Sequence, residues 1–372
     1  MPLLSSFIFG SLAVWVVIVS VILLMPPFDK GVAVGDFSPP PYTGKLNLPF
    51  QDTDIGDQII VEDYYFESGG GEKCHAWLYS ITTEHQQQDR RPPVVVMAPG
   101  MGTQKDFGLD RYATTFVQEG FAVFLFDYRN FGPSEGTPRN WISPQRHIKD
   151  YHAALDFIQT SLQHKVDTSN VFLWGTSFSG GHVLEVTAQR KDDKNIKAIV
   201  SQVPHLNGRK AAKANMKKRG VAKVARLALA TLQDVARSIM GFPPVTVRII
   251  GTGKELSVMD VHPDDFTRYM AKHPPQKLGG WMNSTPARIL LYIRFYNPID
   301  ALSRNDEQLQ VPVLFIGASQ DDLCPPGLIQ EASNLIPNSK WILREGTHFE
   351  IYEAEHWKEM AAEMANFYKS YL

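Results

Sequence analysis

The sequence predicts an α/β fold: a doubly wound, mostly parallel eight-stranded sheet with a helical cap inserted between strands six and seven. Short apolar runs recur along the chain, as they do in strands that are buried on both faces. Helix-length stretches separate most of these runs, which is typical of parallel strands joined by crossover helices. One interval of about a hundred residues is far longer than a crossover needs, and it indicates an inserted cap.

The strands are expected in chain order. Residues 58–66 and 73–81 should form an antiparallel pair around the glycines at 69–71. The other strands are predicted at 94–98, 121–128, 171–174, 196–203, 311–318 and 340–345. Helices are predicted in LDRYATTFVQEG, QRHIKDYHAALDFIQTSL, GGHVLEVTAQR, GLIQEASNLI and EHWKEMAAEMANFYKSY.

The cap is predicted at about 205–305, over the carboxyl ends of the strands. Its first part should be a basic amphipathic helix, because nine Lys or Arg residues lie between Arg209 and Arg237 against Asp234 alone. The apolar face of this helix is predicted to contain Val221, Val224, Ala225, Ala228, Leu232, Val235 and Ile239. A solvated basic face is the expected role, and contact with anionic lipid head groups or a phosphorylated acyl carrier is the alternative.

The chain begins with an apolar stretch, residues 3–24, that has no charge over 22 positions, enough for one helix across a bilayer. A cleaved signal peptide is disfavoured, because no basic region precedes the stretch and no small cleavage-site residues follow it. The predicted organisation is a membrane anchor at 1–25, a proline-rich linker at 26–56 and a catalytic domain at 57–372. The protein would then be a single-pass membrane protein. Lys30 and Lys45 favour the cytosolic side, and a glycosylation sequence at Asn283 points the other way.

Composition narrows the classes of partner and cofactor. The net charge is −2, so the overall balance does not indicate nucleic-acid binding. Cys74 and Cys324 are the only cysteines and lie far apart in the sequence, which matches neither a disulfide framework nor a metal-binding cluster. Both are expected to be packing residues. No metal and no organic cofactor is predicted, and the oligomeric state is left open.

Two segments match the G-x-S-x-G signature of a serine nucleophile. GPSEG at 132–136 fits it fully, whereas GTSFS at 175–179 has Ser179 in place of the last glycine. Such a nucleophile must lie on a sharp turn between a strand and a helix, with small neighbours, so that its hydroxyl is exposed. Ser134 is followed by prolines at 138 and 144, which obstruct an immediate helix. Ser177 stands between a predicted strand and a predicted helix, so it is the expected nucleophile.

The loops after two later strands carry the partners that a serine nucleophile needs. Asp321 and Asp322 follow strand seven, and His348 follows strand eight. The order Ser177, acid, His348 is the chain order of an α/β-hydrolase triad, and each loop lies where open α/β sheets bind their ligands. The backbone N–H groups of Met101 and Phe178 would form an oxyanion hole. A simple glycine turn at 99–102 is the equally weighted alternative.

From about residue 58 to the end, the sequence resembles the serine α/β-hydrolase superfamily. The segments GLDRYATTFVQEGFAV, FDYRNFGPSEGTPR, LWGTSFSGGHV, SQVPHLNG and EGTHFEIY are similar to dienelactone-hydrolase-like esterases and the fungal polyketide transferase and thiohydrolase group. The resemblance implies Ser177 as nucleophile, His348 as base, and an acid four residues before Pro325, at Asp321. Pro99 replaces the frequent histidine of the oxyanion loop, which leaves the backbone N–H groups in place.

These residues together predict a serine hydrolase that cleaves a carboxylic ester or thioester through an acyl-enzyme intermediate. Five cap residues would either line an apolar acyl site or form the core of the cap itself: Phe242, Trp281, Met282, Tyr292 and Phe295. The alternatives are an acyltransferase, a serine peptidase or lysophospholipase with the same triad, and a catalytically silent, membrane-tethered binding protein. The acyl chain, the leaving group and the acceptor are left open.

Overall fold

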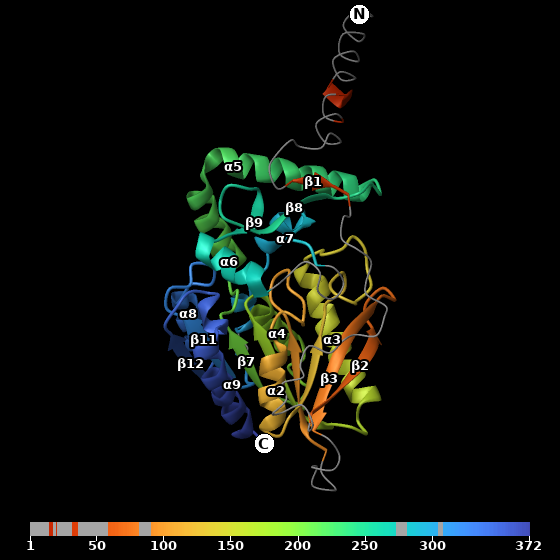
Figure 1. Ribbon diagram of the computed structural model, residues 1–372, viewed down its shortest axis with the longest axis vertical. Coiled ribbons are helices and arrows are strands. Elements are labelled where there is room, and N and C mark those ends of the chain that lie inside the picture. Colours follow the sequence, from red (N-terminus) through yellow and green to blue (C-terminus); the bar gives the residue numbers. More distant parts are fainter. Residues whose placement is uncertain are drawn as a thin grey trace, which may run out of the picture.

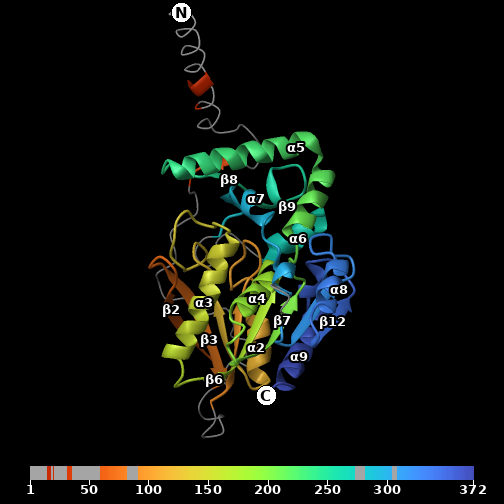
Figure 2. The ribbon, with the colours of Figure 1, turned by 180° about the vertical axis from the view of Figure 1, so that it is seen from behind.

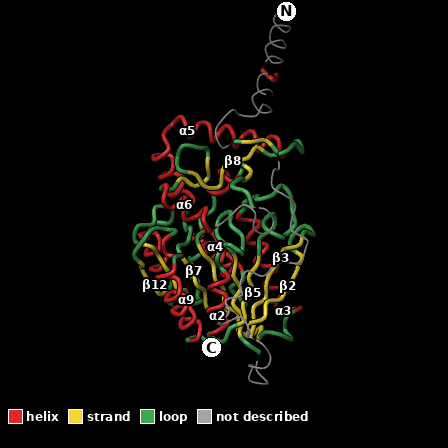
Figure 3. The backbone as a smooth tube through the Cα atoms, viewed as in Figure 1, coloured by secondary structure: helices red, strands yellow, loops and turns green. Residues whose placement is uncertain are grey.

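An eight-stranded mixed sheet lies at the centre of the structure, between layers of helices (Figures 1 and 3). This computed structural model describes residues 15–17, 20, 32–35, 59–81, 91–272, 281–303 and 308–372, without the side chains of 354–356. The strand order is β12-β11-β7-β6-β4-β5-β3-β2. The strands are β2 (Ile59–Glu67), β3 (Lys73–Ile81), β4 (Pro93–Ala98), β5 (Ala122–Phe126), β6 (Asp167–Thr176), β7 (Ile196–Gln202), β11 (Val313–Ala318) and β12 (Ser339–Arg344).

The predicted sheet is confirmed, including its one antiparallel side. β2 pairs antiparallel with β3, and β3 pairs antiparallel with β5. All other neighbours are parallel. β5 and β11 are buried along their whole length, as continuous apolar runs require. Because the parallel strands share one direction, the loops that follow β4, β6, β11 and β12 meet at one edge of the sheet.

The helices cover the two faces of the sheet separately, as a doubly wound fold requires. One apolar core contains residues of α3 (Pro144–Ser161), α4 (Phe178–Gln189) and α8 (Pro326–Asn334). The other contains residues of α2 (Asp110–Gln118) and α9 (Ala354–Lys369). Figure 2 shows α3 and α4 from the side opposite to that of Figure 1.

Residues 208–272 and 281–303, here called the cap, stand at one end of the central sheet (Figure 1). The sequence predicted a helical cap, but the observed cap contains both helices and strands. Its helices are α5 (Gly208–Ile239), α6 (Pro263–Lys272) and α7 (Ile289–Ile293). They accompany a small sheet in which β8 (Val245–Gly251) pairs with β9 (Ser257–Asp260) and β10 (Thr285–Pro286). The β-branched run VTVRIIG favours a strand at β8. Its partner β9 follows it closely in the sequence, whereas β10 lies farther along the chain.

Part of the predicted linker belongs to this small sheet. β1 (Ala33–Val34) pairs antiparallel with β8, with Ala33 opposite Thr246 and Val34 opposite Val245. At β1, the segment predicted as a linker therefore contacts the cap instead of running separately from it. Apart from residues 32–35, the stretch 26–56 lies outside the described residues.

The predicted membrane anchor and single-pass location are contradicted. A helix needs about 20 largely apolar residues to span a bilayer. Among the residues that the structure describes, no helix is both long and apolar enough to do so. Most of residues 1–25 lies outside the described part of the chain, which includes only 15–17 and 20 of that stretch.

Helix α5 does not bury the apolar face that its sequence suggested. The helix bends at Gly220, where φ is 73°, and Val221, Leu232 and Ile239 are 87%, 60% and 81% exposed. Asp234 faces inward instead, because its carboxylate accepts hydrogen bonds from Val245 N at 3.0 Å and from Arg288 Nε at 2.7 Å. A buried carboxylate with these partners decides which side of the helix packs on the cap sheet.

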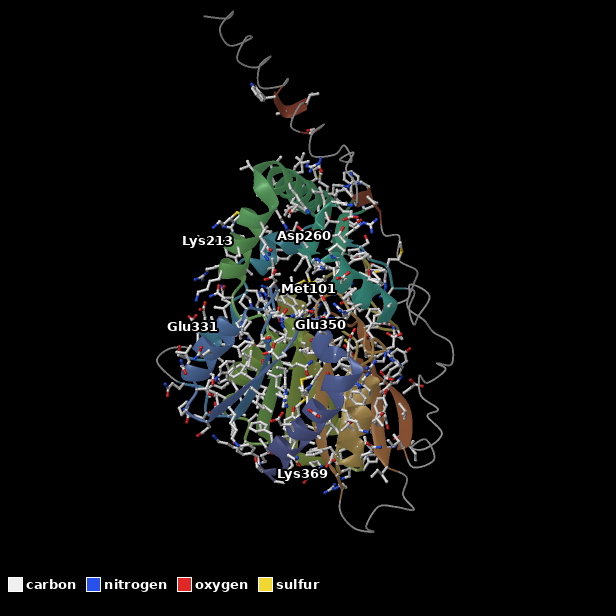
Figure 4. All side chains as sticks on the ribbon, turned by 60° about the vertical axis from the view of Figure 1, so that its left-hand side comes forward. Met101, Lys213, Asp260, Glu331, Glu350 and Lys369 are labelled. Atoms are coloured by element: carbon white, nitrogen blue, oxygen red, sulfur yellow. The ribbon has the colours of Figure 1, made fainter. Side chains whose placement is uncertain are left out.

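The basic side chains of α5 are partly neutralised by neighbouring carboxylates. Lys210 Nζ lies 2.6 Å from Glu331 on α8, and Lys218 Nζ lies 2.9 Å from Asp322. Lys223 binds Asp260 at 2.9 Å. Figure 4 shows α5, with Lys213, close to Glu331 of α8. The basic surface is therefore in part a bridge between the cap and the rest of the domain, which the sequence alone did not predict.

Candidate active site

Ser177 lies on the turn between β6 and α4. Its φ of 55° and ψ of −118° are strained for a residue with a side chain. The turn leaves no room for larger neighbours, because a Cβ on Gly175 would lie 2.2 Å from the Ser179 carbonyl oxygen. Two backbone hydrogen bonds fix the turn: Ser177 N donates to Gln202 O at 2.8 Å, and His205 N donates to Ser177 O at 2.9 Å. The strand, serine and helix have the arrangement expected of a nucleophile elbow.

The structure brings the three predicted triad residues together. His348 Nε2 lies 3.1 Å from Ser177 Oγ, and His348 Nδ1 lies 2.6 Å from Asp321 Oδ2. His348 and Asp321 are both buried. The other carboxylate oxygen, Asp321 Oδ1, accepts the backbone N–H groups of Leu323 and Cys324 at 2.8 and 2.7 Å. These bonds hold the carboxylate with its free edge towards the imidazole.

The directions of their side chains decide which of the two adjacent aspartates, Asp321 or Asp322, can be the partner of His348. The Asp322 side chain is 86% exposed and bonds to Lys218 on α5. Consecutive residues of a turn point to different sides, so one carboxylate faces His348 while the next faces solvent. The geometry thus favours Asp321 as the partner of the imidazole.

The two predicted oxyanion donors, Met101 and Phe178, both lie near Ser177. Met101 is buried on the loop after β4 and lines the same cavity as Ser177 and His348. A Cβ on Gly100 would lie 3.2 Å from Ser177 Cβ, so the loop passes directly beside the serine. Phe178 is the first residue of α4. Its N–H is one of those that a helix leaves without an internal acceptor, at the positive end of the helix dipole.

A buried ion pair holds the loop of Met101. Asp127, directly after β5, accepts Lys105 N at 2.7 Å and Lys105 Nζ at 2.6 Å. Both side chains are almost fully buried. From the cap, Trp281 Nε1 donates to Gly102 O at 2.6 Å. Figure 4 shows Met101 between the cap and the central sheet. Sequence reasoning missed Lys105, Asp127 and the role of Trp281, because their contacts join distant segments.

The cavity beside the triad has mainly apolar walls. Its lining includes Met101, Phe107, Leu109, Met259, Tyr269, Phe349 and Tyr352, with Arg111 and Arg268 among the polar groups. The cap contributes Met259, Arg268 and Tyr269. None of the five cap residues that the sequence suggested lines this cavity. Trp281 is fully buried, and Phe242 and Phe295 are exposed.

A cluster of buried histidines and tyrosines contacts Phe178, the residue after the nucleophile. Sequence reasoning missed this cluster as well. His182 Nδ1 lies 2.6 Å from the hydroxyl of Tyr296, a cap residue, and His182 Nε2 lies 3.3 Å from His147 Nδ1. The ring of His205 stacks on that of Tyr296. The rings of His182 and His205 also contact Phe178 edge-on. The cluster therefore links the first residue of α4 to the cap.

These histidines should make stability depend on pH. Burial lowers the pKa of His205 from 6.5 to about 4, and lowers the pKa of His147 and of His182 well below 6.5. The unfolded chain therefore binds more protons than the folded one below pH 6.5. The free energy of unfolding should be fully retained above pH 6.5. Between pH 6.5 and 4 it should fall by up to about 1.4 kcal/mol per pH unit for each histidine.

Urea unfolding at a series of pH values measures this dependence. The variant His205→Phe keeps a ring of similar shape but removes one proton-binding site. Its free energy of unfolding should fall less steeply than that of the wild type between pH 6.5 and 4. An identical slope in the two proteins would contradict the assignment of acid sensitivity to this cluster.

Ser134, the serine that matches the G-x-S-x-G signature fully, has a structural role, because its side chain is hydrogen-bonded to the backbone of two other residues. Its hydroxyl is fully buried, donates to Asp127 O at 2.8 Å and accepts from His75 N at 2.9 Å. Ser134→Ala should lower the free energy of unfolding by about 1–3 kcal/mol, because the hydrogen bond to a buried N–H is lost. Hydrolysis by the folded variant should be retained. Loss of hydrolysis with unchanged stability would make Ser134 the nucleophile.

Comparisons with known proteins agree with the fold. The family described as "Serine aminopeptidase, S33" matches residues 89–348. The quorum-quenching protein AidA of Acinetobacter baumannii is 33% identical over 80% of this chain and 91% of its own length. A thiohydrolase of Eupenicillium brefeldianum is 24% identical over 82% of this chain and 92% of its own length. A solved α/β hydrolase of a Penicillium species superposes with a TM-score of 0.66 at 18% identity, over 84% of this chain and 99% of that one.

Proposed function

Because the chain belongs to the serine aminopeptidase S33 family of α/β hydrolases and is a hydrolase of the esterase and thiohydrolase type, we propose that it cleaves carboxylic esters or thioesters through an acyl-enzyme on Ser177. The observation that carries the proposal is the line of contacts from Asp321 through His348 to Ser177, with spacings of 2.6 and 3.1 Å. This line ends beside a cavity with mainly apolar walls.

In the proposed first half-reaction, Ser177 Oγ attacks the carbonyl carbon of the substrate while His348 Nε2 accepts the hydroxyl proton. The carbonyl oxygen becomes negative, and the N–H groups of Met101 and Phe178 would stabilise that charge. The intermediate then expels the alcohol or thiol, which takes the proton from His348. Asp321 stabilises the imidazolium and holds the ring in position.

In the second half-reaction, water attacks the acyl-enzyme. His348 takes a proton from the water and returns it to Ser177 Oγ, so the carboxylic acid leaves and the enzyme is restored. The apolar side chains around the cavity support an apolar acyl group as the part of the substrate bound there, because burying such a group removes its surface from water.

The proposed acid makes a paired prediction. Asp321→Asn should lower kcat for ester hydrolysis by roughly 10³–10⁴-fold, because an amide no longer enforces the productive tautomer of His348. Asp322→Asn, one residue away, should keep its rate, because the Asp322 side chain is exposed and contacts Lys218. Steady-state kinetics with one chromogenic ester measure both. Equal losses in the two variants would contradict the assignment of Asp321.

A fluorophosphonate probe tests the proposed function directly. The full chain is treated with the probe, and the modified residue is found by mass spectrometry of its peptides. Modification of Ser177 in the wild type, with its loss in His348→Ala, is the expected result, followed by a screen of acyl esters, thioesters and peptides. A folded protein that resists the probe, or one modified at Ser134 or Ser179, would overturn the proposal.

A further inference from the structure

Cys324 lies beside two residues of the proposed triad, and the proposed mechanism does not use its thiol. A ligand atom of Asp321, one of His348 and the sulfur of Cys324 all lie within 4.8 Å of one another, and all three residues are buried. The local chain explains the approach. The backbone N–H of Cys324 donates to Asp321 Oδ1 at 2.7 Å, so the turn brings residue 324 back against the carboxylate.

These three side chains present one oxygen, one nitrogen and one sulfur, the ligand types that zinc binds in proteins. Ligand atoms around a tetrahedral zinc ion lie roughly 3.3–3.8 Å apart, so side-chain movements of about 1 Å would close the set around an ion. A carboxylate, a thiolate and a neutral imidazole together balance the charge of a divalent cation, which suits a buried position. The thiolate favours Zn²⁺ or Cd²⁺ over Mg²⁺ or Ca²⁺.

We propose that Asp321, Cys324 and His348 form a binding site for a thiophilic divalent cation such as Zn²⁺, and that an ion bound there reversibly inhibits the hydrolase. The binding half stands on the geometry of these three side chains. The inhibitory half rests on the proposed function.

Binding and catalysis compete for the same imidazole. When the ion binds, the thiol releases its proton to solvent and the sulfur coordinates as thiolate. An ion on His348 Nδ1 breaks the bond to Asp321 and places the remaining ring proton on Nε2, which then no longer accepts the proton of Ser177. An ion on Nε2 occupies the atom that faces Ser177. In either case His348 cannot act as the base.

Cadmium binding to the full chain tests the site without any substrate. A Cd²⁺–thiolate bond gives an ultraviolet charge-transfer band, which reports coordination by cysteine. The band should appear on titration of the wild type and of Cys74→Ala, because Cys74 is buried on β3 and belongs to no such cluster among the described residues. It should be absent in Cys324→Ala. A band of equal strength in Cys324→Ala, or no band in the wild type, would overturn the site.

Probe labelling tests inhibition separately. Zn²⁺ should slow fluorophosphonate labelling of the wild type and of Cys74→Ala by at least tenfold, EDTA should restore it, and Mg²⁺ should have no effect. The labelling rate of each variant with metal is compared with the rate of the same variant without metal. If Cys324→Ala does not fold, Cys324→Ser takes its place in both experiments. A Cd²⁺ band without any effect of Zn²⁺ on labelling would overturn inhibition. Absence of labelling even without metal would instead overturn the proposed function, while the Cd²⁺ band still decides the site.

Discussion

Ser177→Ala should abolish ester hydrolysis, with a fall in kcat of roughly 10⁶-fold, because no other group in the proposed mechanism forms the covalent intermediate. Fold stability should hardly change, since among the described residues the Ser177 side chain has one hydrogen bond, with His348. Ser177→Gly should be equally inactive. It should also be more stable than the wild type by about 1 kcal/mol, because glycine relieves the strain of a φ of 55°.

Initial rates on a chromogenic ester and urea unfolding measure the two effects. Ser179→Ala is the matched control. The Ser179 hydroxyl contacts the hydroxyls of Tyr128 at 3.0 Å and Tyr151 at 3.2 Å, away from the imidazole of His348. This variant should lose stability and keep hydrolysis. Hydrolysis that persists in purified Ser177→Ala would contradict the assignment of Ser177 as the nucleophile.

Lys105→Met should cost about 3–5 kcal/mol of unfolding free energy, because it leaves the buried carboxylate of Asp127 without its cationic partner. Methionine is close in size to the aliphatic part of lysine, so packing against Trp77 is largely kept. The change should also lower kcat in the protein that remains folded, since the same ion pair holds the loop that carries Met101.

The exposed pair between Lys165 and Glu62 provides the comparison. Lys165→Met removes an ion pair whose partners are both about one-third exposed, and it should cost under about 1 kcal/mol. Urea unfolding of the two variants, with kcat measured well below the midpoint of unfolding, separates stability from catalysis. Similar small costs for both variants would show that the pair of Lys105 and Asp127 does not stabilise the fold.

The central sheet could be predicted from the sequence because its signal is local. A buried parallel strand must be apolar along its whole length. Runs such as 94–98 and 121–128 can therefore be recognised as strands without knowing which strands they pair with. The candidate nucleophile was predictable for the same reason. The requirement for a strand, a small-residue turn and a helix concerns adjacent residues, and GTSFSGGH meets it at Ser177.

The features that local patterns did not predict are contacts between distant segments. β1 and β8 form a strand pair across more than two hundred residues. The buried Asp234, through its bond to Arg288, decides which face of α5 turns inward, against the apolar pattern of that helix. The cap residues that line the cavity, Met259, Arg268 and Tyr269, are placed there by the same kind of contact between distant segments.

The acid of the candidate site and the position of Cys324 also depend on tertiary structure. The sequence placed two aspartates after strand seven, and only the fold turns Asp321 towards His348 and Asp322 towards Lys218. It identified Cys324 as an isolated cysteine, and only the fold brings this thiol to the carboxylate and the imidazole. Periodicity determines which residues are buried in a strand, whereas the direction of one side chain depends on partners that the chain supplies from elsewhere.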